Sequence, residues 1–178
     1  MIPEDNGTRR RGIRGERYEV FVSKDDFRFN AAHFMAYPGF RERLHGHNYR
    51  VGVRVEGELG EEGYVVDFGD VKRAARAICS ELNERLIVPA KSDCLRLSRE
   101  GGQLEIECTD DGSRFSLPEA DCVMLPIVHS SAEELAAWFS ERLIEMLHAS
   151  GKRRLTAVEV TVAESPKQEA RYHRDLRS

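Results

Sequence analysis

The chain has 178 residues, and 27 Lys and Arg against 31 Asp and Glu give it a net charge of −4. With 40% hydrophobic residues it is too apolar for a disordered protein, and it lacks the run of about 20 apolar residues that spans a membrane. The acidic balance disfavours a general nucleic-acid binder, and the absence of an apolar leader at the N-terminus predicts a cytoplasmic protein. We therefore expect neither nucleic acid nor a membrane as a partner.

The first 17 residues are polar and contain Arg9, Arg10 and Arg11. This composition predicts a flexible N-terminal arm over residues 1–17. Residues 18–178 have a length typical of one domain, and we expect an insertion in that domain at about residues 90–120.

Alternating apolar residues predict two long strands in the first part of this domain. One runs from Tyr18 to His33 with a bulge or bend near residues 24–26, and the other runs from His45 to about Glu56. The loop between them contains Pro38 and is too short for a crossover connection. The two strands are therefore expected to be antiparallel neighbours.

Two segments show helical spacing of apolar residues. The first helix is expected to begin near Asp67 or Asp70, which can cap it, and to end near Leu82. The second begins after Ser130 or Ser131, with a glutamate three residues later as in a capping box, and ends at Gly151.

Three short alternating runs over residues 94–117 lie between the helices, separated by glycine-containing turns, and they predict inserted β-structure. A strand through residues 158–164 and a short strand over residues 170–173 complete the chain. This order of elements is typical of an α+β domain.

Three histidines are placed to converge. His45 and His47 are two residues apart, so on a strand both imidazoles leave the same face, and His33 ends the preceding strand with matching parity. Three imidazole ligands leave one position of a tetrahedral Zn²⁺ open, which is the arrangement of a catalytic site. A cation held in this way can polarise a substrate oxygen or lower the pKa of a bound water.

Five segments carry further motifs, namely FNAAH at 29–33, LHGHNY at 44–49, VVDFGDVK at 65–72, SSAE at 130–133 and VAESP at 162–166. In this order they resemble the motif series of the 6-pyruvoyl-tetrahydropterin synthase and 6-carboxytetrahydropterin synthase superfamily. The resemblance implies the T-fold (tunnelling fold), an antiparallel four-stranded sheet with two helices on one face. It also implies a homohexamer, built as a dimer of trimers, with active sites between subunits.

The resemblance implies ligands as well. The three histidines would bind zinc, and Glu164 would anchor a pterin ring, assisted by Ser130, Ser131 and Glu133. A carboxylate suits this role because it accepts two parallel hydrogen bonds, here from the 2-amino and N3 groups of the ring.

The chain departs from the family at its proton-transfer residues. Family members usually have a cysteine shortly before the His-Gly-His motif and a histidine at the end of the first helix. Residues 38–44 contain no cysteine, and Glu84 stands in place of that histidine. Glu42, three residues before His45, is our first candidate for the base, because some relatives use a glutamate there to cleave dihydroneopterin-type side chains. His129, because histidine is a residue type suited to acid–base work, and Glu84 follow in that order.

The leading functional prediction is a zinc-dependent lyase acting on the C6 side chain of a dihydropterin. A 6-carboxy, 6-pyruvoyl or 6-hydroxymethyl product is compatible with the motifs, the last by retro-aldol cleavage of dihydroneopterin or its phosphate. The alternative is a non-catalytic, zinc-containing oligomer that binds a pterin or purine. A zinc-stabilised structural oligomer without a ligand is the third reading.

Overall fold

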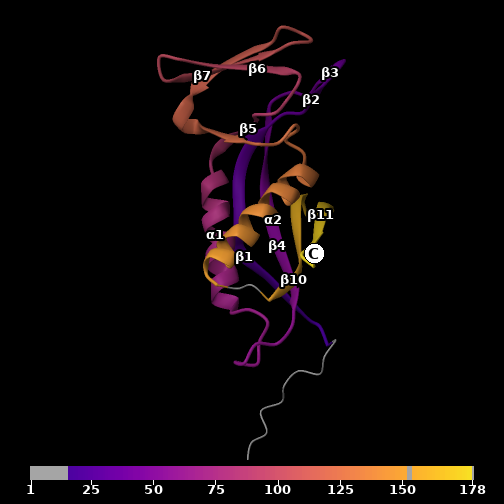
Figure 1. Cartoon of the computed structure of the whole chain (residues 1–178). Helices are drawn as coiled ribbons and strands as arrows, with labels where there is room; N and C mark the ends of the chain where they lie inside the picture. The colour runs from indigo at the N-terminus through magenta and orange to yellow at the C-terminus, as the bar shows by residue number, and fades with distance from the viewer. Residues whose placement is uncertain (1–15, 152–153, 178) are drawn as a thin grey trace, which may run out of the picture.

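The structure is a computed structural model that describes residues 16–151 and 154–177. The N-terminal arm predicted over residues 1–17 lies outside the described residues except for its last two. A long sheet runs the length of the molecule and two helices lie across one of its faces (Figure 1). The helices are α1 (Phe68–Leu82) and α2 (Ala132–Ala149).

The main sheet has six strands in the order β11-β10-β4-β1-β5-β9. Their bounds are β1 (Tyr18–His33), β4 (His45–Gly57), β5 (Arg85–Pro89), β9 (Cys122–Leu125), β10 (Leu155–Ser165) and β11 (Gln168–Asp175). The first four strands of that order pair with one another in antiparallel fashion, and β5 pairs in parallel with β1 and with β9.

The predicted pairing of the two long strands is confirmed. β1 and β4 are antiparallel, with His33 opposite His45 and Ala31 opposite His47, and their register shifts between Ser23 and Arg28. The expected interruption near residues 24–26 is this irregularity. Because side chains alternate along a strand, the register places all three histidines on the face that also carries the core residues Phe29 and Tyr49.

The core lies between this face of the sheet and the helices. Alternate residues of β1, β4 and β10 are buried against the apolar stripes of α1 and α2. Both helices begin as predicted: Asp67 Oδ1 accepts the Gly69 N–H at 2.6 Å, and Ser131 Oγ accepts the Glu134 N–H at 3.3 Å. Among the described residues, neither helix is long and apolar enough to cross a membrane.

The expectation of a four-stranded antiparallel sheet was incomplete. All four expected strands are present, but β5 and β9 extend the sheet and make it mixed. The residues of β5 from Leu86 to Pro89 are all buried, so the strand lacks the alternation by which the others were predicted. Parallel strands covered on both faces typically read as short continuous apolar runs, which periodicity does not distinguish from other buried segments.

The predicted insertion is a separate three-stranded sheet formed by β6 (Leu95–Glu100), β7 (Gln103–Cys108) and β8 (Arg114–Pro118). A single 3₁₀ turn, η1 (Glu119–Asp121), leads from it to β9. The insertion lies at one end of the molecule beside a small hairpin, β2 (Ala36–Tyr37) and β3 (Phe40–Arg41) (Figure 1). A second apolar cluster joins Phe34 and β5 to the inner face of the insertion.

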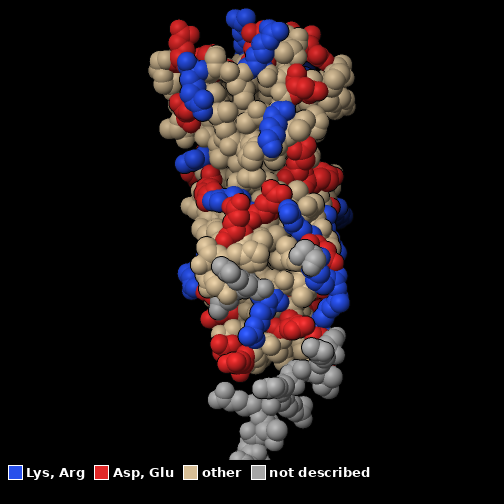
Figure 2. All heavy atoms as spheres, in the orientation of Figure 1, with Lys and Arg blue, Asp and Glu red and all other residues tan. Residues whose placement is uncertain are grey.

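Charged side chains of both signs are interspersed on the face of the molecule shown in Figure 2. Many of them are paired across elements, as in Arg76 with Asp26 and Arg142 with Glu81. Exposed pairs of this kind contribute little to folding stability, typically about 0–1 kcal/mol each. The buried face of the long sheet therefore contributes more to folding stability than these surface pairs do.

Candidate active site

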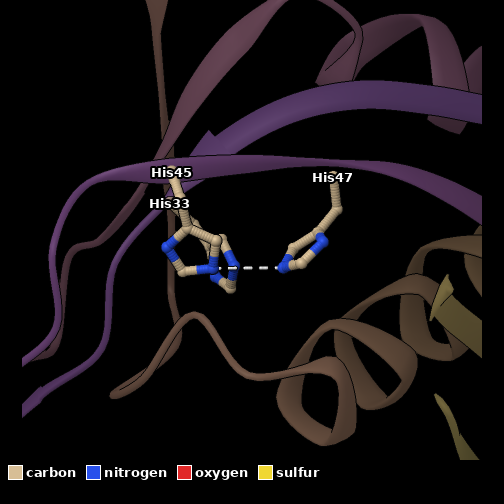
Figure 3. Close-up of side chains that lie close together, drawn as sticks. All are labelled: His33, His45 and His47. Carbon is tan, nitrogen blue, oxygen red and sulfur yellow. Dashed lines mark hydrogen bonds between the residues drawn. The ribbon is translucent and has the colours of Figure 1, made fainter.

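The three histidines come together at one end of the sheet. His33 is the last residue of β1, and His45 and His47 lie at the start of β4 (Figure 3). One nitrogen from each ring lies within 4.8 Å of the others, and Nε2 of His45 is 3.1 Å from Nε2 of His47. This compact group of three ring nitrogens could hold a single metal ion.

The opposite ring nitrogens are held by backbone carbonyls. His33 Nδ1 lies 2.8 Å from the carbonyl oxygen of Ser130, and His45 Nδ1 lies 2.8 Å from that of Arg43. A carbonyl oxygen only accepts hydrogen bonds, so each Nδ1 carries a proton, and in a neutral ring this leaves the lone pair on Nε2. Metal-binding histidines typically have this arrangement, in which a bond at the outer nitrogen sets the tautomer and the ring orientation.

The donor set fits a zinc ion. Nε2 of His33 is buried and has no hydrogen-bond partner, although a buried polar atom normally has one. Desolvation is the main cause that lowers the pKa of His33, so the ring is neutral and able to ligate at neutral pH. A cation shared by the three Nε2 atoms would satisfy His33 and would leave one tetrahedral position open.

The carbonyl that orients His33 belongs to a tightly held loop before α2. Ser130 is fully buried, and its hydroxyl donates to the carbonyl oxygen of Phe34 at 2.8 Å. The Glu134 carboxylate accepts the N–H groups of Val128 at 2.7 Å and His129 at 3.1 Å. Ser130 therefore supports the histidine cluster through its backbone, and its hydroxyl does not line the pocket.

A pocket of about 450 Å³ opens beside the histidines. This volume is within the usual range of small-ligand sites. Seven of the ten residues predicted for the site line it, together with Met35 just before β2 and residues of α2 and β11 that the sequence did not single out. The lining residues are His33, Met35, Glu42, His45, His47, Ser131, Ala132, Glu133, Glu164, Gln168, Glu169 and Ala170.

Glu42 projects into this pocket from the segment after β3. Its Oε1 lies 3.9 Å from Nε2 of His45, and its Oε2 accepts the Met35 N–H at 3.3 Å. The Glu42 N–H donates in turn to the Met35 carbonyl at 2.8 Å. These two bonds hold the carboxylate next to the histidines without burying it.

Besides Ser130, two further predicted residues lie outside the pocket. His129 does not line it, and its Nδ1 is buried without a partner in the loop before α2. Glu84 lies in another depression, which His47 also lines, with Asn30 and Asn48, whose side chains leave the opposite face of the sheet from the histidines. Its φ of 60° is uncommon for a residue other than glycine, and its N–H donates to the Asn30 carbonyl at 2.6 Å.

A family model described as 6-pyruvoyl tetrahydropterin synthase matches residues 22–175. The match covers every residue that lines the pocket. The chain belongs to this family.

Two relatives of this tetrahydropterin synthase family match most of the chain. A protein of Methanocaldococcus jannaschii, provisionally named 6-carboxy-5,6,7,8-tetrahydropterin synthase, is 30% identical over 150 residues, which are 84% of this chain and 91% of its own. A solved structure of Plasmodium vivax 6-pyruvoyltetrahydropterin synthase is 41% identical, with a TM-score of 0.84 over 90% of this chain and 99% of its own. That structure is of a catalytic-residue variant in which a glutamate is replaced by alanine.

A shorter match comes from an aldolase. The dihydroneopterin monophosphate aldolase of Pyrococcus furiosus is 40% identical over 57 residues, which are 32% of this chain and 48% of its own. Synthases and an aldolase thus both occur among the relatives of this member of the family.

Sequence reasoning missed two groups of residues at the site. Gln168, Glu169 and Ala170 line the pocket at the turn into β11, but the sequence only indicated a short strand there. The backbone carbonyl groups of Arg43 and Ser130 orient two histidines. Every residue type has such a carbonyl, so the sequence does not show which ones take this role. For the loop before α2, which contains Ser130, the capping motif around Ser131 was the one signal in the sequence that it would be ordered.

Proposed function

We propose that this chain is a zinc-dependent enzyme that acts on the C6 side chain of a dihydropterin. One observation carries the proposal: a single pocket holds a histidine triad that fits a cation, a carboxylate 3.9 Å from one of those histidines, and a second carboxylate, Glu164, at the end of β10. Membership of the tetrahydropterin synthase family supports the substrate class.

His33, His45 and His47 would hold the metal. When bound there, zinc supplies a Lewis acid that polarises an oxygen of the substrate side chain. The carbonyls of Ser130 and Arg43 keep the histidine rings oriented for this task.

Glu164 would bind the ring end of the substrate. It lies at the end of a strand whose alternate residues Val158, Val160 and Val162 are fully buried, so the sheet fixes its position. Ser131 and Glu133, at the start of α2, line the same pocket and would assist it. Ser130 would contribute through its backbone carbonyl, which orients the His33 ring.

Glu42 would remove a proton from the substrate side chain. It is the only carboxylate of the pocket within 4.0 Å of a described histidine nitrogen. A base there would lie near the substrate oxygen that zinc polarises, where the protons of the side chain are most acidic. The P. vivax relative has a catalytic glutamate, which supports a glutamate in this role. His129 and Glu84 rank second and third, because neither lines the pocket.

The product identifies the reaction. Zinc-loaded protein would be incubated with dihydroneopterin, its monophosphate and its triphosphate, and the products would be identified by mass spectrometry. A 6-carboxy, 6-pyruvoyl or 6-hydroxymethyl pterin supports the proposal and selects the subclass. Tight pterin binding without turnover would instead favour the non-catalytic binding oligomer, and neither binding nor turnover would favour a structural role for zinc.

The ring anchor makes a separate prediction. Glu164→Gln replaces an acceptor oxygen with a donor that opposes the N–H groups of the ring. We expect neopterin to bind about 30-fold more weakly, equivalent to about 2 kcal/mol for a lost charge-assisted hydrogen bond. Glu159→Gln on the same strand is the control, because Glu159 pairs with Arg54 and does not line the pocket. Equal affinity of the Glu164 variant and the wild type in a fluorescence titration would refute the anchor role.

Assembly makes another prediction. Strands β11 and β9 are the two edges of the main sheet, and exposed edges are usually covered by further strands or by a partner. We expect a homohexamer of 20.3 kDa protomers, arranged as a dimer of trimers, with a trimer as the minimum. Light scattering at micromolar concentration measures the mass, and a monomer would contradict this prediction. A cytoplasmic location without nucleic-acid or membrane partners also stays a prediction.

A further inference from the structure

The segment that carries Glu42 has little structure of its own. Strands β2 and β3 have two residues each, and Tyr37 and Phe40 stack on each other at 4.8 Å with nearly half of each side chain exposed. An isolated two-stranded hairpin is marginally stable in water. Contacts from outside the hairpin are therefore needed to keep Glu42 in one place.

Those contacts come from the turn between β7 and β8 of the insertion. Arg41 Nε lies 2.6 Å from Asp111 Oδ2, and the Gly39 N–H donates to the Asp110 carboxylate. The same guanidinium also donates from Nη1 to the carbonyl oxygen of Glu42 at 3.1 Å. Arg41 thus connects the insertion directly to the backbone of the proposed base.

Asp111 is itself held in place. Its Oδ1 accepts the Ser113 N–H at 2.9 Å. The bonds from Arg41 and Ser113 lower its pKa to about 2, so the carboxylate is charged throughout the pH range of an enzyme assay. The charge needed to hold Arg41 is therefore always present.

An aromatic contact joins the insertion to the metal side of the pocket. The Arg41 guanidinium carbon lies 5.9 Å from the centre of the Phe115 ring, and Phe115 stacks on Phe34 at 5.0 Å. Phe34 is buried and follows His33 directly. The insertion consequently contacts both the strand end that presents a histidine and the segment that presents Glu42.

We propose that the insertion formed by β6–β8 positions Glu42 relative to the histidines, and that Arg41 and Asp111 are the positioning residues. This inference rests on the proposed function, because it assigns the pair an effect on the proposed base. The pair is partly exposed and contributes little to global stability, so its loss should leave the fold intact. Proton transfer is far more sensitive, since a displacement of about 1 Å can reduce a rate 100-fold.

The test compares Asp111→Asn with Glu107→Gln. Glu107 pairs with Arg96 and Arg114 in the same three-stranded sheet and bonds to neither Arg41 nor Glu42. We expect Asp111→Asn to lower kcat about 10-fold with KM and zinc content within 2-fold of wild type, Asp111→Glu to restore part of kcat, and Glu107→Gln to leave kcat unchanged. Unchanged kcat in Asp111→Asn would overturn the proposal.

A double-mutant cycle shows whether the pair acts through Glu42. In a Glu42→Gln background, Asp111→Asn should cause no further loss of kcat, because the group that it positions has been removed. An equal loss in both backgrounds would mean that Asp111 acts on another part of the protein, and would overturn the proposal.

Hydrogen exchange separates this inference from the proposed function. If the wild type turns over no dihydropterin, the proposed function fails, but the exchange rate of the Glu42 amide still reports on the positioning. This amide donates to the Met35 carbonyl, so it should exchange at least 10-fold faster in Asp111→Asn and at the wild-type rate in Glu107→Gln. Unchanged exchange at Glu42 in Asp111→Asn would overturn the positioning role.

Discussion

Glu42→Gln is expected to lower kcat by about 10²–10⁴-fold, the usual contribution of a general base. Glutamine keeps the size of the side chain and can still contact the Met35 backbone, but it does not accept a proton from the substrate. Zinc content and neopterin affinity should stay at the wild-type level, because the histidines and Glu164 are unchanged. Steady-state kinetics, with metal analysis of the same preparation, measures all three quantities.

His129→Ala is the comparison for Glu42→Gln. His129 lies outside the pocket, so its removal should reduce kcat by a smaller factor than the loss of Glu42. The reverse order would assign proton transfer to His129. If kcat is unaffected by either change, neither residue is the base.

His45→Ala is expected to remove zinc from the protein. The substitution leaves two of three nitrogen ligands and also removes the orienting bond to the Arg43 carbonyl. We expect zinc affinity to fall by more than about 100-fold, since loss of an outer-shell partner alone typically reduces affinity 10–100-fold. Turnover should fall to background with it. Elemental analysis after dialysis against a weak chelator gives the zinc content per protomer.

His173→Ala is the matched control for this loss. His173 is an exposed histidine on β11 and does not line the pocket. Zinc content should stay stoichiometric in this variant. Full retention of zinc by His45→Ala would contradict the metal site. The Glu42 and His45 variants also distinguish proton transfer from metal binding. The Glu42 variant should keep zinc but lose most turnover, whereas the His45 variant should lose both.

Local patterns were sufficient for much of this protein. Strand parity is a property of the backbone, so the spacing of His45 and His47 places both rings on one face wherever that segment is extended. The same rule applied to His33 brings the third ring to the same side once the strands pair. The helices were also readable, because capping residues and a 3.6-residue apolar repeat act within a single element.

Strands β5 and β9 show where local patterns are insufficient. The run from Leu86 to Val88 is apolar throughout. It therefore lacks the alternation of apolar and polar residues that identifies a strand with one buried face. Its structure is set by the groups around it, namely β1 along one edge, β9 along the other, and apolar side chains on both faces. The sheet was therefore predicted with four strands where the tertiary structure has six.

The sequence by itself determined the histidine spacing, the two capped helices, the insertion and the order of motifs that indicates the family. The tertiary structure decided which of the candidate acids and bases share the pocket with those histidines. It placed Glu42 inside and His129 and Glu84 outside, although all three were candidates for the base. It also joined Arg41 to Asp111 across 70 residues of sequence. The physical reason is that a contact between distant segments depends on how whole elements pack, and no periodicity within either segment encodes it.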